Sequence, residues 1–412
     1  MAFTKDQWTR PAKQPDGTVK RVRNEARWGR GKRWLAVWLD PNGAERSKAF
    51  DTKTAATKYA AAMETDRERG DYFDPEGGKA KLAEVAAHWL ASRDVDPSTE
   101  IHYETKWRLH VGPAFGNRQL RSIRPSEIGS WLTRVKTAYG PSTARSAFLV
   151  LNGCLELAVA DGLIKKNPAQ SKLVTRPATS RSKVHVWTPD LVDRIIDVHP
   201  DEYRLIPILG AACGLRQGEI FGLALEDFDF EEQVIRVRRQ VKKLGKHFVF
   251  ALPKNDLERE VPLAAWPAAR VHEYVERHAP EPYSLPWERP DNEPVTANLL
   301  FRWLDGGHMK ARNYDEVVWK PALAAAGVIP PAVRDARGRR HFKTDRTTGL
   351  HALRHHYASV SLADGVNIKE LAEYLGHGDP GFTLALYTHL LPSSHDRARR
   401  AIDARFERLS AA

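Results

Sequence analysis

One polar stretch interrupts the hydrophobic patterning of this chain and divides it in two. Residues 170–185 read QSKLVTRPATSRSKVH, a basic run without helical or strand periodicity between two long patterned regions. Such a composition is typical of a linker. The chain has 412 residues, which is too many for one ordinary domain. We therefore expect separate domains on the two sides of a linker at 171–186.

The region before the linker begins with a small sheet and one helix. Residues 34–50 alternate around the turn signal DPNG, which predicts a hairpin with Trp34 and Trp38 on one face. Residues 52–70 then follow a helical pattern, and the turn-rich stretch DYFDPEGG comes next. We expect these elements to form one small domain over 1–75.

Four helical segments follow, and they predict a helical domain over residues 80–170. The third of them, PSEIGSWLTRVKTA, shows the pattern most plainly. It places Ile128, Trp131, Leu132 and Val135 at helical spacing, so these side chains are expected to share one buried face.

The region after the linker, 187–412, mixes helices with short strands. Three alternating runs, QVIRVRRQ, HFVFALP and REVPL, predict one small antiparallel sheet. The tail RARRAIDARFERLS is amphipathic, with Ala398, Ile402, Phe406 and Leu409 on one side, and predicts a C-terminal helix. The expected fold class is multidomain and mainly α with small β-sheets, ending in a mixed α/β domain.

The charge balance favours a polyanionic partner. Lysine and arginine number 64 against 52 acidic residues, which gives a net charge of +12. Residues 1–60 hold 14 of these cations against 6 acidic residues, so a net +8 is concentrated at the start of the chain. Nucleic acid is the usual partner of such a surplus.

Other features narrow the class of protein. The two cysteines, Cys154 and Cys213, lie in apolar runs and provide neither a disulfide framework nor a cysteine metal site. No apolar stretch is expected to span a membrane, and the start MAFTKDQWTR is too polar for a signal peptide. We expect a soluble cytoplasmic protein without a membrane partner.

Three fragments beyond the linker, with one lysine between them, gather side chains that suit phosphate chemistry. The three fragments are CGLRQGEIFGL, LHALRHHYASV and LGHGDPGFTLALYTHLLP, and the stretch LPKNDLEREVPL lies between the first two. Together they supply these side chains: Arg216, Glu219, Lys254, His351, Arg354, His355, His377 and Tyr387.

Each of these residues also has a purely structural interpretation. Arg216 and Glu219 are spaced as a helical ion pair, and a tyrosine on a helix is usually half-buried core. His351 and His355 are four residues apart, as metal ligands can be, but the HExxH glutamate is missing and no nearby carboxylate completes a metal set. The P-loop and the Rossmann glycine fingerprint are absent as well. We therefore expect neither a metal nor a cofactor.

Taken together, the residues favour phosphoryl transfer without a metal. Guanidinium groups match phosphate oxygens bidentately and can neutralise the charge that develops on a pentacoordinate phosphorus. A tyrosine hydroxyl can act as the nucleophile and form a covalent intermediate. Its ordinary pKa near 10 means that it needs cationic neighbours or a base, and His and Lys can move the protons.

The same fragments resemble the tyrosine recombinase, or phage integrase, family. The family's G-L-R-x-G-E box is found at 214–219, H-x-L-R-H at 351–355, L-G-H at 375–377 and Y-x-H at 387–389. All four boxes occur in the family's order. The match is of the type found in integrases of actinobacterial phages and integrative elements.

The resemblance implies a mechanism and a role for each residue. The nucleophile would attack a DNA phosphodiester and leave a 3′-phosphotyrosyl link, which a 5′-hydroxyl of the partner duplex then attacks. Tyr387 would be the nucleophile, Arg216 and Arg354 would clamp the phosphate, and Lys254 would protonate the leaving oxygen. His351 would transfer a proton to or from the tyrosine, and His377 would hydrogen-bond a phosphate oxygen. Glu219 would orient Arg216 or His351. Lys242, Lys243 and Lys246 are alternatives to Lys254.

The resemblance extends to the earlier domains and to partners. Residues 1–75 look like an arm-binding domain, a three-stranded sheet on a helix, and 80–170 like a core-binding domain. The implied partners are double-stranded attachment sites of core and arm type, further copies in a tetramer on DNA, a directionality factor and a host DNA-bending protein. The protein would then be nucleoid-associated when bound. The expected arm contacts are Arg21, Arg23, Arg30, Lys32 and Arg33.

Three other functions fit part of the pattern. A type IB topoisomerase shares the chemistry but relaxes DNA instead of exchanging strands, and an N-terminal arm-type domain argues against it. A catalytically inactive DNA-binding regulator would not need the complete residue set. A metal-dependent phosphodiesterase would need ligands that the sequence does not offer. A site-specific recombinase that integrates or excises a mobile element is the function expected here.

Overall fold

The backbone contacts divide the chain into two units, residues 1–180 and 181–412. The computed structural model describes residues 2–15, 17–41, 43–69, 72, 77–177, 185–254, 257–345 and 347–387, with 399, 402, 403 and 406. The division falls within the expected linker at 171–186, of which 178–184 lie outside the described residues.

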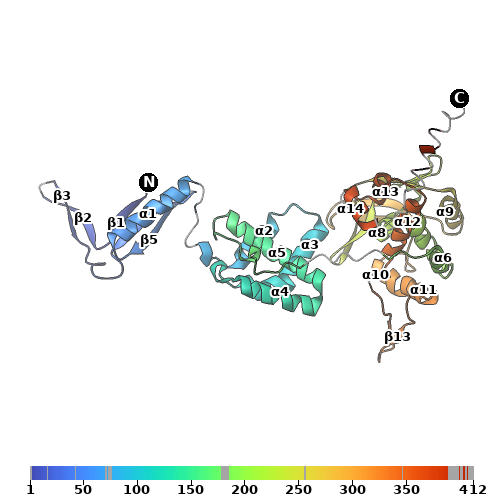
Figure 1. Cartoon of the computed structure of the whole chain (residues 1–412), viewed down its shortest axis with the longest axis horizontal. Helices are drawn as coiled ribbons and strands as arrows, with labels where there is room; N and C mark the ends of the chain where they lie inside the picture. The colour runs from blue at the N-terminus through green and yellow to red at the C-terminus, as the bar shows by residue number, and fades with distance from the viewer. Residues whose placement is uncertain are drawn as a thin grey trace. The chain divides into compact units, whose positions relative to one another are not determined.

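The first part of unit 1 is a small sheet packed on one helix (Figure 1). Its elements are β1 Phe3–Asp6, β2 Thr9–Lys13, β3 Val19–Arg23, β4 Trp34–Leu39, β5 Glu45–Phe50 and α1 Lys53–Glu68. The antiparallel sheet has the order β1-β4-β5, and β2 pairs with β3 in a separate hairpin that the sequence did not predict. The core joins Ala36 and Trp38 of β4 to Ala56, Ala60 and Met63 of α1. The predicted hairpin and helix are confirmed.

The second part of unit 1 is a helical bundle with its own core. It comprises α2 Leu82–Ala91, α3 Pro97–Lys106, a π-helical segment Trp107–Gly116, α4 Pro125–Tyr139 and α5 Pro141–Ala160. The predicted face of α4 is confirmed, because Ile128, Trp131, Leu132 and Val135 are all buried. The cores of the two parts share no buried residue, which supports two separate domains before the linker.

One expectation about membranes needs correction. Helix α5 has 20 residues and a mean hydropathy of 1.3, so by length and composition alone it could cross a membrane. This finding contradicts the expectation that no apolar stretch of the sequence is long enough to span a membrane. In the fold, α5 packs through residues such as Leu151, Cys154 and Leu155 in the centre of the bundle. Its apolar composition is therefore that of a core helix.

Unit 2 contains the mixed α/β fold that the sequence predicted. Its helices are α6 Pro189–Asp197, α7 Leu205–Ala212, α8 Gln217–Gly222, α9 Ala265–Arg277, α10 Ala311–Tyr314, α11 Lys320–Ala325, α12 His351–Ala363, α13 Ile368–Leu375 and α14 Pro380–Tyr387. Its strands are β6 Phe228–Asp229, β7 Val234–Val237, β8 Gln240–Leu244, β9 His247–Ala251, β10 Arg259–Pro262, β11 Glu281–Pro286, β12 Pro294–Leu299, β13 Val333–Arg334 and β14 Arg340–His341.

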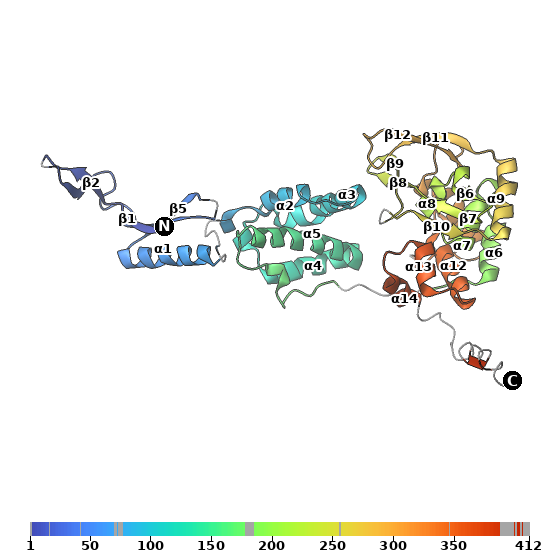
Figure 2. The same cartoon turned by 90° about the horizontal axis from the view of Figure 1, so that it is seen from above.

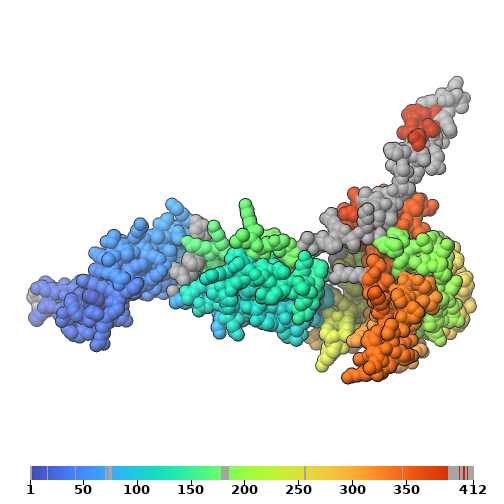
Figure 3. All heavy atoms as spheres, turned by 60° about the horizontal axis from the view of Figure 1, so that its bottom comes forward, coloured from blue at the N-terminus to red at the C-terminus, as the bar shows by residue number. Residues whose placement is uncertain are grey.

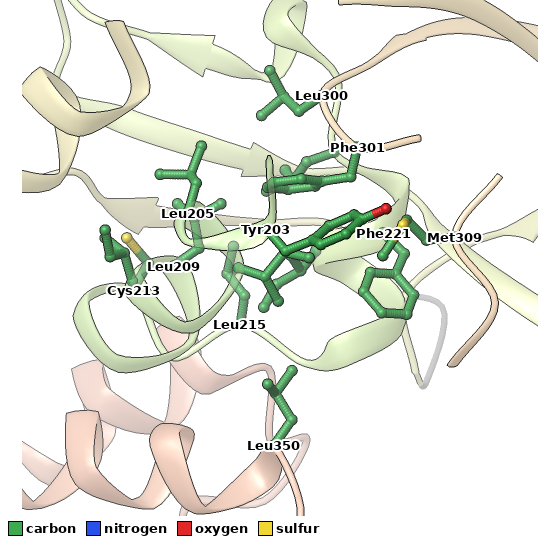
Figure 4. Packing of buried hydrophobic residues seen from close by; sticks show 14 of the residues in the cluster. Tyr203, Leu205, Leu209, Cys213, Leu215, Phe221, Leu300, Phe301, Met309 and Leu350 are labelled. Atoms are coloured by element: carbon green, nitrogen blue, oxygen red, sulfur yellow. The ribbon is translucent and has the colours of Figure 1, made fainter. Parts of the chain in front are cut away.

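Helix α7 runs through the main core of unit 2. Figure 4 shows Leu205 and Leu209 of this helix packed with Tyr203, Phe221 and Phe301. All five side chains are buried. This core holds α8, which begins directly after the GLR run, in a fixed position.

The prediction of one sheet from three alternating runs was wrong. β10 pairs with β7, which pairs with β6, whereas β8 and β9 form a separate hairpin. The run QVIRVRRQ breaks between β7 and β8 at Arg239. The Nη2 atom of Arg239 lies 3.0 Å from both carboxylate oxygens of the buried Asp227. This anchor interrupts the strand, and the two halves of the run join different sheets.

The last three described helices form a small cluster of their own. Figure 2 shows α12, α13 and α14 side by side, with α13 next to β10. Their buried side chains are Ala358, Leu362, Leu371, Leu375 and Tyr387, a cluster separate from the main core.

The predicted C-terminal helix is described only in part. Ile402 and Phe406 are helical and exposed, whereas Ala398 and Leu409 lie outside the described residues.

The closest approach between α2 and α5 generates a stability prediction. A Cβ atom on Gly153 of α5 would lie 2.4 Å from the ring of Trp89, so Gly153→Ala forces the helices or the ring apart. We expect this change to lower the free energy of unfolding by about 1–3 kcal/mol, although alanine favours helix by about 1 kcal/mol. Urea unfolding of the full chain, followed by tryptophan fluorescence, measures the effect.

Gly129→Ala on α4 is the matched control. A Cβ there meets only the Leu173 carbonyl oxygen at 3.8 Å, an ordinary contact, so stability should hold or rise. An unchanged or higher urea midpoint for Gly153→Ala would contradict the prediction, because it would mean that the Trp89 ring moves aside without loss of stability.

Candidate active site

Arg216 occupies the N-terminal end of α8 and is held there by Glu219. The backbone nitrogen of Arg216 donates to Glu219 Oε2 at 2.9 Å, and its Nη1 donates to Oε1 at 2.8 Å. Its Nη2 donates to the carbonyl oxygen of Gly376 at 3.0 Å. The arginine side chain is only 19% exposed, so these contacts fix its direction.

Gly376 is positioned by backbone geometry. It ends α13 with φ of +59°, a left-handed conformation that favours glycine. A Cβ atom there would also lie 3.1 Å from the side chain of Arg259. The L-G-H box thus places a glycine where the chain must turn and where an arginine passes closely.

A second arginine, Arg259, completes the contacts of Glu219. Its Nη1 and Nη2 atoms donate to the two Glu219 oxygens at 3.0 and 2.7 Å, and its Nε donates to the Tyr374 carbonyl oxygen at 2.7 Å. Burial alone would raise the pKa of Glu219, but the hydrogen bonds and charges of Arg259 and Arg216 lower it to about 2. Glu219 is therefore an ionised, fully buried anchor.

Arg354 lies on α12 and is 1% exposed. Its Nη1 donates to the Gly214 carbonyl oxygen at 2.7 Å, and its Nη2 donates to the Leu375 carbonyl oxygen and to His377 Nε2, the latter at 3.1 Å. Burial, with the nearby Arg216 charge, lowers its pKa to about 9. Within the described residues, Arg354 Nε is buried without a hydrogen-bond partner. Such an orphaned donor is uncommon.

Two histidines of the boxes, His351 and His377, are neutral. Burial and the neighbouring arginines lower the pKa of His351 to about 4 and that of His377 to about 3. The guanidinium of Arg354 can only donate, so His377 Nε2 accepts and its Nδ1 carries the proton. That Nδ1 lies 2.7 Å from Thr383 Oγ1 and donates to it.

These residues surround one cavity of about 460 Å³. Its lining residues are Arg216, Lys254, His351, Gly376, His377, Gly378, Asp379 and Phe382. Of the four candidate lysines, Lys254 is the one that lines this cavity, and it is exposed in the turn after β9. The cavity thus presents the basic side chains of Arg216 and Lys254, two neutral imidazoles and the carboxyl group of Asp379 to a ligand.

Tyr387 lies outside that lining. It is 1% exposed at the end of α14, and its Oη is 2.7 Å from His355 Nδ1. Burial raises the pKa of Tyr387 to about 12, only partly offset by Arg354, and burial lowers the pKa of His355 to about 4. This hydrogen bond therefore joins a neutral phenol to a neutral imidazole.

The structure adds Arg259 and Thr383 to the set named from the sequence, and it gives His355 of that set a partner. Arg259, Thr383 and His355 each bind a predicted site residue. His355 stood within a recognised box without a role. Arg259 precedes the VPL strand, a position that offered a signal, whereas Thr383 offered none.

The basic residues predicted to contact DNA lie in unit 1, and several have internal partners. Arg33 Nη2 donates to Asp6 at 2.9 Å, Arg21 Nε donates to Thr9 at 2.8 Å, and the Arg23 guanidinium lies 4.1 Å from the ring centre of Trp28. Lys32 lies 3.7 Å from Asp51, and Arg30 is exposed. Their contact with DNA stays a prediction.

Comparisons with known proteins identify the family of this chain. Residues 186–394 match the Phage integrase family, and residues 82–172 match the Phage integrase central domain. The chain is 26% identical over 370 residues to the putative prophage phiRv2 integrase of Mycobacterium tuberculosis, covering 87% of this chain and 88% of that relative. It is 24% identical over 395 residues to the XerC-like tyrosine recombinase of Caldanaerobacter subterraneus, covering 90% and 95%.

Solved structures share the fold. The Tn1549 transposon integrase, solved with transposon right end DNA, superimposes with a TM-score of 0.61 at 22% identity over 80% of this chain and 100% of that chain. A lambda integrase tetramer bound to a Holliday junction gives 0.52 at 16% identity over 87% and 95%. The chain belongs to the phage integrase family and is a site-specific recombinase of the tyrosine type.

The depressed pKa of Glu219 generates a prediction about acid stability. Its folded pKa of about 2 is below its ordinary value of 4.5, so the ionised carboxylate stabilises the fold above pH 4.5. That stabilisation, on the order of 3 kcal/mol, is lost as the pH falls towards 2. We expect Glu219→Gln to be less stable at pH 7 but to show a weaker pH dependence between 4.5 and 2. Urea midpoints of both proteins across this window measure it.

Proposed function

We propose that this chain cuts and rejoins DNA strands through a covalent bond between Tyr387 and a 3′ phosphate. The observation that carries the proposal is the convergence of Arg216, Lys254, His351 and His377 on one cavity next to the buried Arg354. The guanidinium groups of Arg216 and Arg354 can each bind two phosphate oxygens, and the neutral imidazoles lie beside them. This arrangement suits the charge that develops on a phosphodiester when it is cleaved.

The proposed first step transfers a phosphoryl group from DNA to the enzyme. Tyr387 Oη forms a bond to phosphorus while the bond from phosphorus to the 5′ oxygen breaks. Lys254 gives a proton to that oxygen, and Arg216 and Arg354 neutralise the non-bridging oxygens. A 5′-hydroxyl then attacks the phosphorus of the phosphotyrosine and releases the tyrosine. This second step reverses the first, so the reaction needs no external energy source.

His351, His377 and Glu219 have supporting roles in this proposal. His351, neutral at pH 7, accepts the tyrosine proton as the bond forms. His377 would hydrogen-bond a phosphate oxygen after exchanging its Thr383 contact for the ligand. Glu219 is a positioning residue, since its two oxygens are already occupied by arginines.

The nucleophile must move before it reacts. Tyr387 is absent from the cavity lining and its Oη is bound to His355. Helix α14 has eight residues and buries only Thr383 and Tyr387. A short helix with so few core contacts opens at low cost. We infer that α14 rearranges when DNA binds and delivers the hydroxyl to the phosphate.

The partners follow from the family and from the related structures. The lambda structure is a tetramer on a Holliday junction, and the Tn1549 structure contains transposon end DNA. We infer that this chain also acts on double-stranded core sites as a tetramer. Residues 1–75 would bind arm sites, and a directionality factor and a host DNA-bending protein would complete the assembly.

The central test removes one oxygen atom. Tyr387→Phe keeps the ring packing, so the variant should fold and bind a core duplex with unchanged affinity. It should form no SDS-resistant adduct with a suicide duplex nicked beside the cleavage point. Tyr357→Phe and Tyr374→Phe are the controls, and both should still form the adduct. An adduct that persists in Tyr387→Phe and vanishes in a control would overturn the assignment.

Three assays separate the alternative functions from the proposed one. An inactive regulator gives no adduct with the wild-type chain. A topoisomerase relaxes supercoiled plasmid but does not exchange strands between two attachment sites. A metal-dependent phosphodiesterase loses its activity in EDTA, whereas the proposed reaction continues.

The charge of the first domain generates a second prediction. Deletion of residues 1–75 removes a separate core and the concentrated positive charge. We expect cleavage of a core-site duplex to be largely unchanged, because the catalytic residues lie in unit 2. Binding to distal arm sites should weaken, and integration should be abolished. Gel-shift and plasmid integration assays measure these effects, and full integration by the truncated chain would contradict the arm-binding role.

A further inference from the structure

A basic hairpin precedes α12 in unit 2. Strands β13 and β14 pair through Val333 with His341 and Arg334 with Arg340. Figure 1 shows this hairpin extending outward from the body of the unit, and the orange segment that contains it lies on the outer surface in Figure 3. Residues 333–343 hold five cations and one carboxylate, which are Arg334, Arg337, Arg339, Arg340, Lys343 and Asp335.

The single carboxylate organises the turn. Asp335 Oδ1 accepts from the backbone nitrogens of Arg337 and Arg339 at 2.8 and 2.9 Å. Its Oδ2 accepts from Arg339 Nε at 2.9 Å and lies 3.0 Å from His341 Nε2. These donors lower the pKa of Asp335 to about 2, with the His341 hydrogen bond as the largest cause. The turn is therefore pre-formed.

Among the described residues, three of the other four cations have no internal side-chain partner, whereas Arg334 Nη1 donates to the carbonyl oxygen of Gly338 at 2.8 Å. The side chains of Arg337, Arg340 and Lys343 are exposed and make no hydrogen bond or ion pair within the described part of the chain. Phe342, between two of them, is partly buried against the main core and fixes the base of the hairpin. A basic run is usually a solvated surface, but here its turn is rigid and its base is anchored.

We propose that this hairpin binds the sugar–phosphate backbone of the duplex beside the cleavage point. The inference rests on the proposed action on DNA. Exposed guanidinium and ammonium groups on a fixed turn suit phosphate oxygens, which are the densest regular negative charge that such a protein meets. Contacts of this kind position a protein on DNA without reading its sequence.

The chain connectivity limits where the contact falls. Lys343 is eight positions before His351, which lines the cavity. Eight residues span at most about 29 Å when fully extended. Along one strand of DNA, at roughly 3.4 Å per nucleotide, this corresponds to about eight base pairs. With the reach of the lysine side chain added, the phosphates bound by the base of the hairpin lie within roughly one turn of DNA of the cleaved bond.

The test removes three charges and measures the salt dependence of binding. The variant Arg337→Ala/Arg340→Ala/Lys343→Ala leaves the Asp335 contacts in place. For a core-site duplex, its affinity should fall about tenfold or more. The slope of log affinity against log salt should become shallower by about 2–3 units. A duplex of unrelated sequence should show the same change, since phosphates carry no sequence information.

A matched control removes equal charge elsewhere in the unit. Arg194 on α6 and Arg277 on α9 are exposed and Arg270 on α9 is half-buried, and their triple alanine variant should keep both affinity and slope. Surface ion pairs such as those of α9 contribute little to stability, so both variants should fold, which thermal unfolding checks.

The outcomes separate this proposal from the proposed function. Adduct formation by the hairpin variant on the suicide duplex, at saturating protein, should equal that of the wild type. An unchanged salt slope would overturn the hairpin proposal while leaving the chemistry intact. Loss of tetramer assembly with normal binding to a single half-site would also overturn it, because the hairpin would then contact a second copy. Absence of any wild-type adduct would instead reject the proposed function.

Discussion

The arrangement of the active site depends on one buried carboxylate. Glu219 accepts hydrogen bonds from the guanidinium groups of Arg216 and Arg259, and the same two arginines donate to the carbonyl oxygens of Gly376 and Tyr374. This cluster ties α8, β10 and the end of α13 together. Removal of its charge would leave two buried cations without a counterion, which is costly. The direction of Arg216 in the cavity is thus set by a segment 160 positions further along the chain.

The proposed phosphate-binding groups and the proposed nucleophile are held apart. Arg216 and Lys254 already face the cavity, whereas Tyr387 is packed in a small separate cluster and bound to His355. Burial keeps the phenol protonated and the imidazole neutral. The tyrosine is therefore stored in an unreactive form beside a binding site that is largely formed. A nucleophile that becomes bonded to DNA gains from such a movable position, since the helix that carries it contributes little to the main core.

The regular parts of the fold were predictable from local patterns. Periodicity alone identified the buried face of α4 and the β4–β5 hairpin, because each pattern repeats within one element. The pairing of β7, β8, β9 and β10 was not predictable in this way. It depends on the contact of Arg239 with the buried Asp227, a side-chain anchor between elements that no alternation of residues reveals.

The sequence by itself determined which residue types are available for catalysis and their order, because four short boxes carry the arginines, histidines and tyrosine. Its periodicity also predicted a linker at 171–186, and the division of the chain into two units falls within that range. Only the tertiary structure decided that Arg259 shares Glu219 with Arg216, that Arg354 fixes the tautomer of His377, and that His355 holds Tyr387. The physical reason is that these contacts join segments distant in the chain, and burial in the folded unit, not residue type, sets the pKa values of the groups involved.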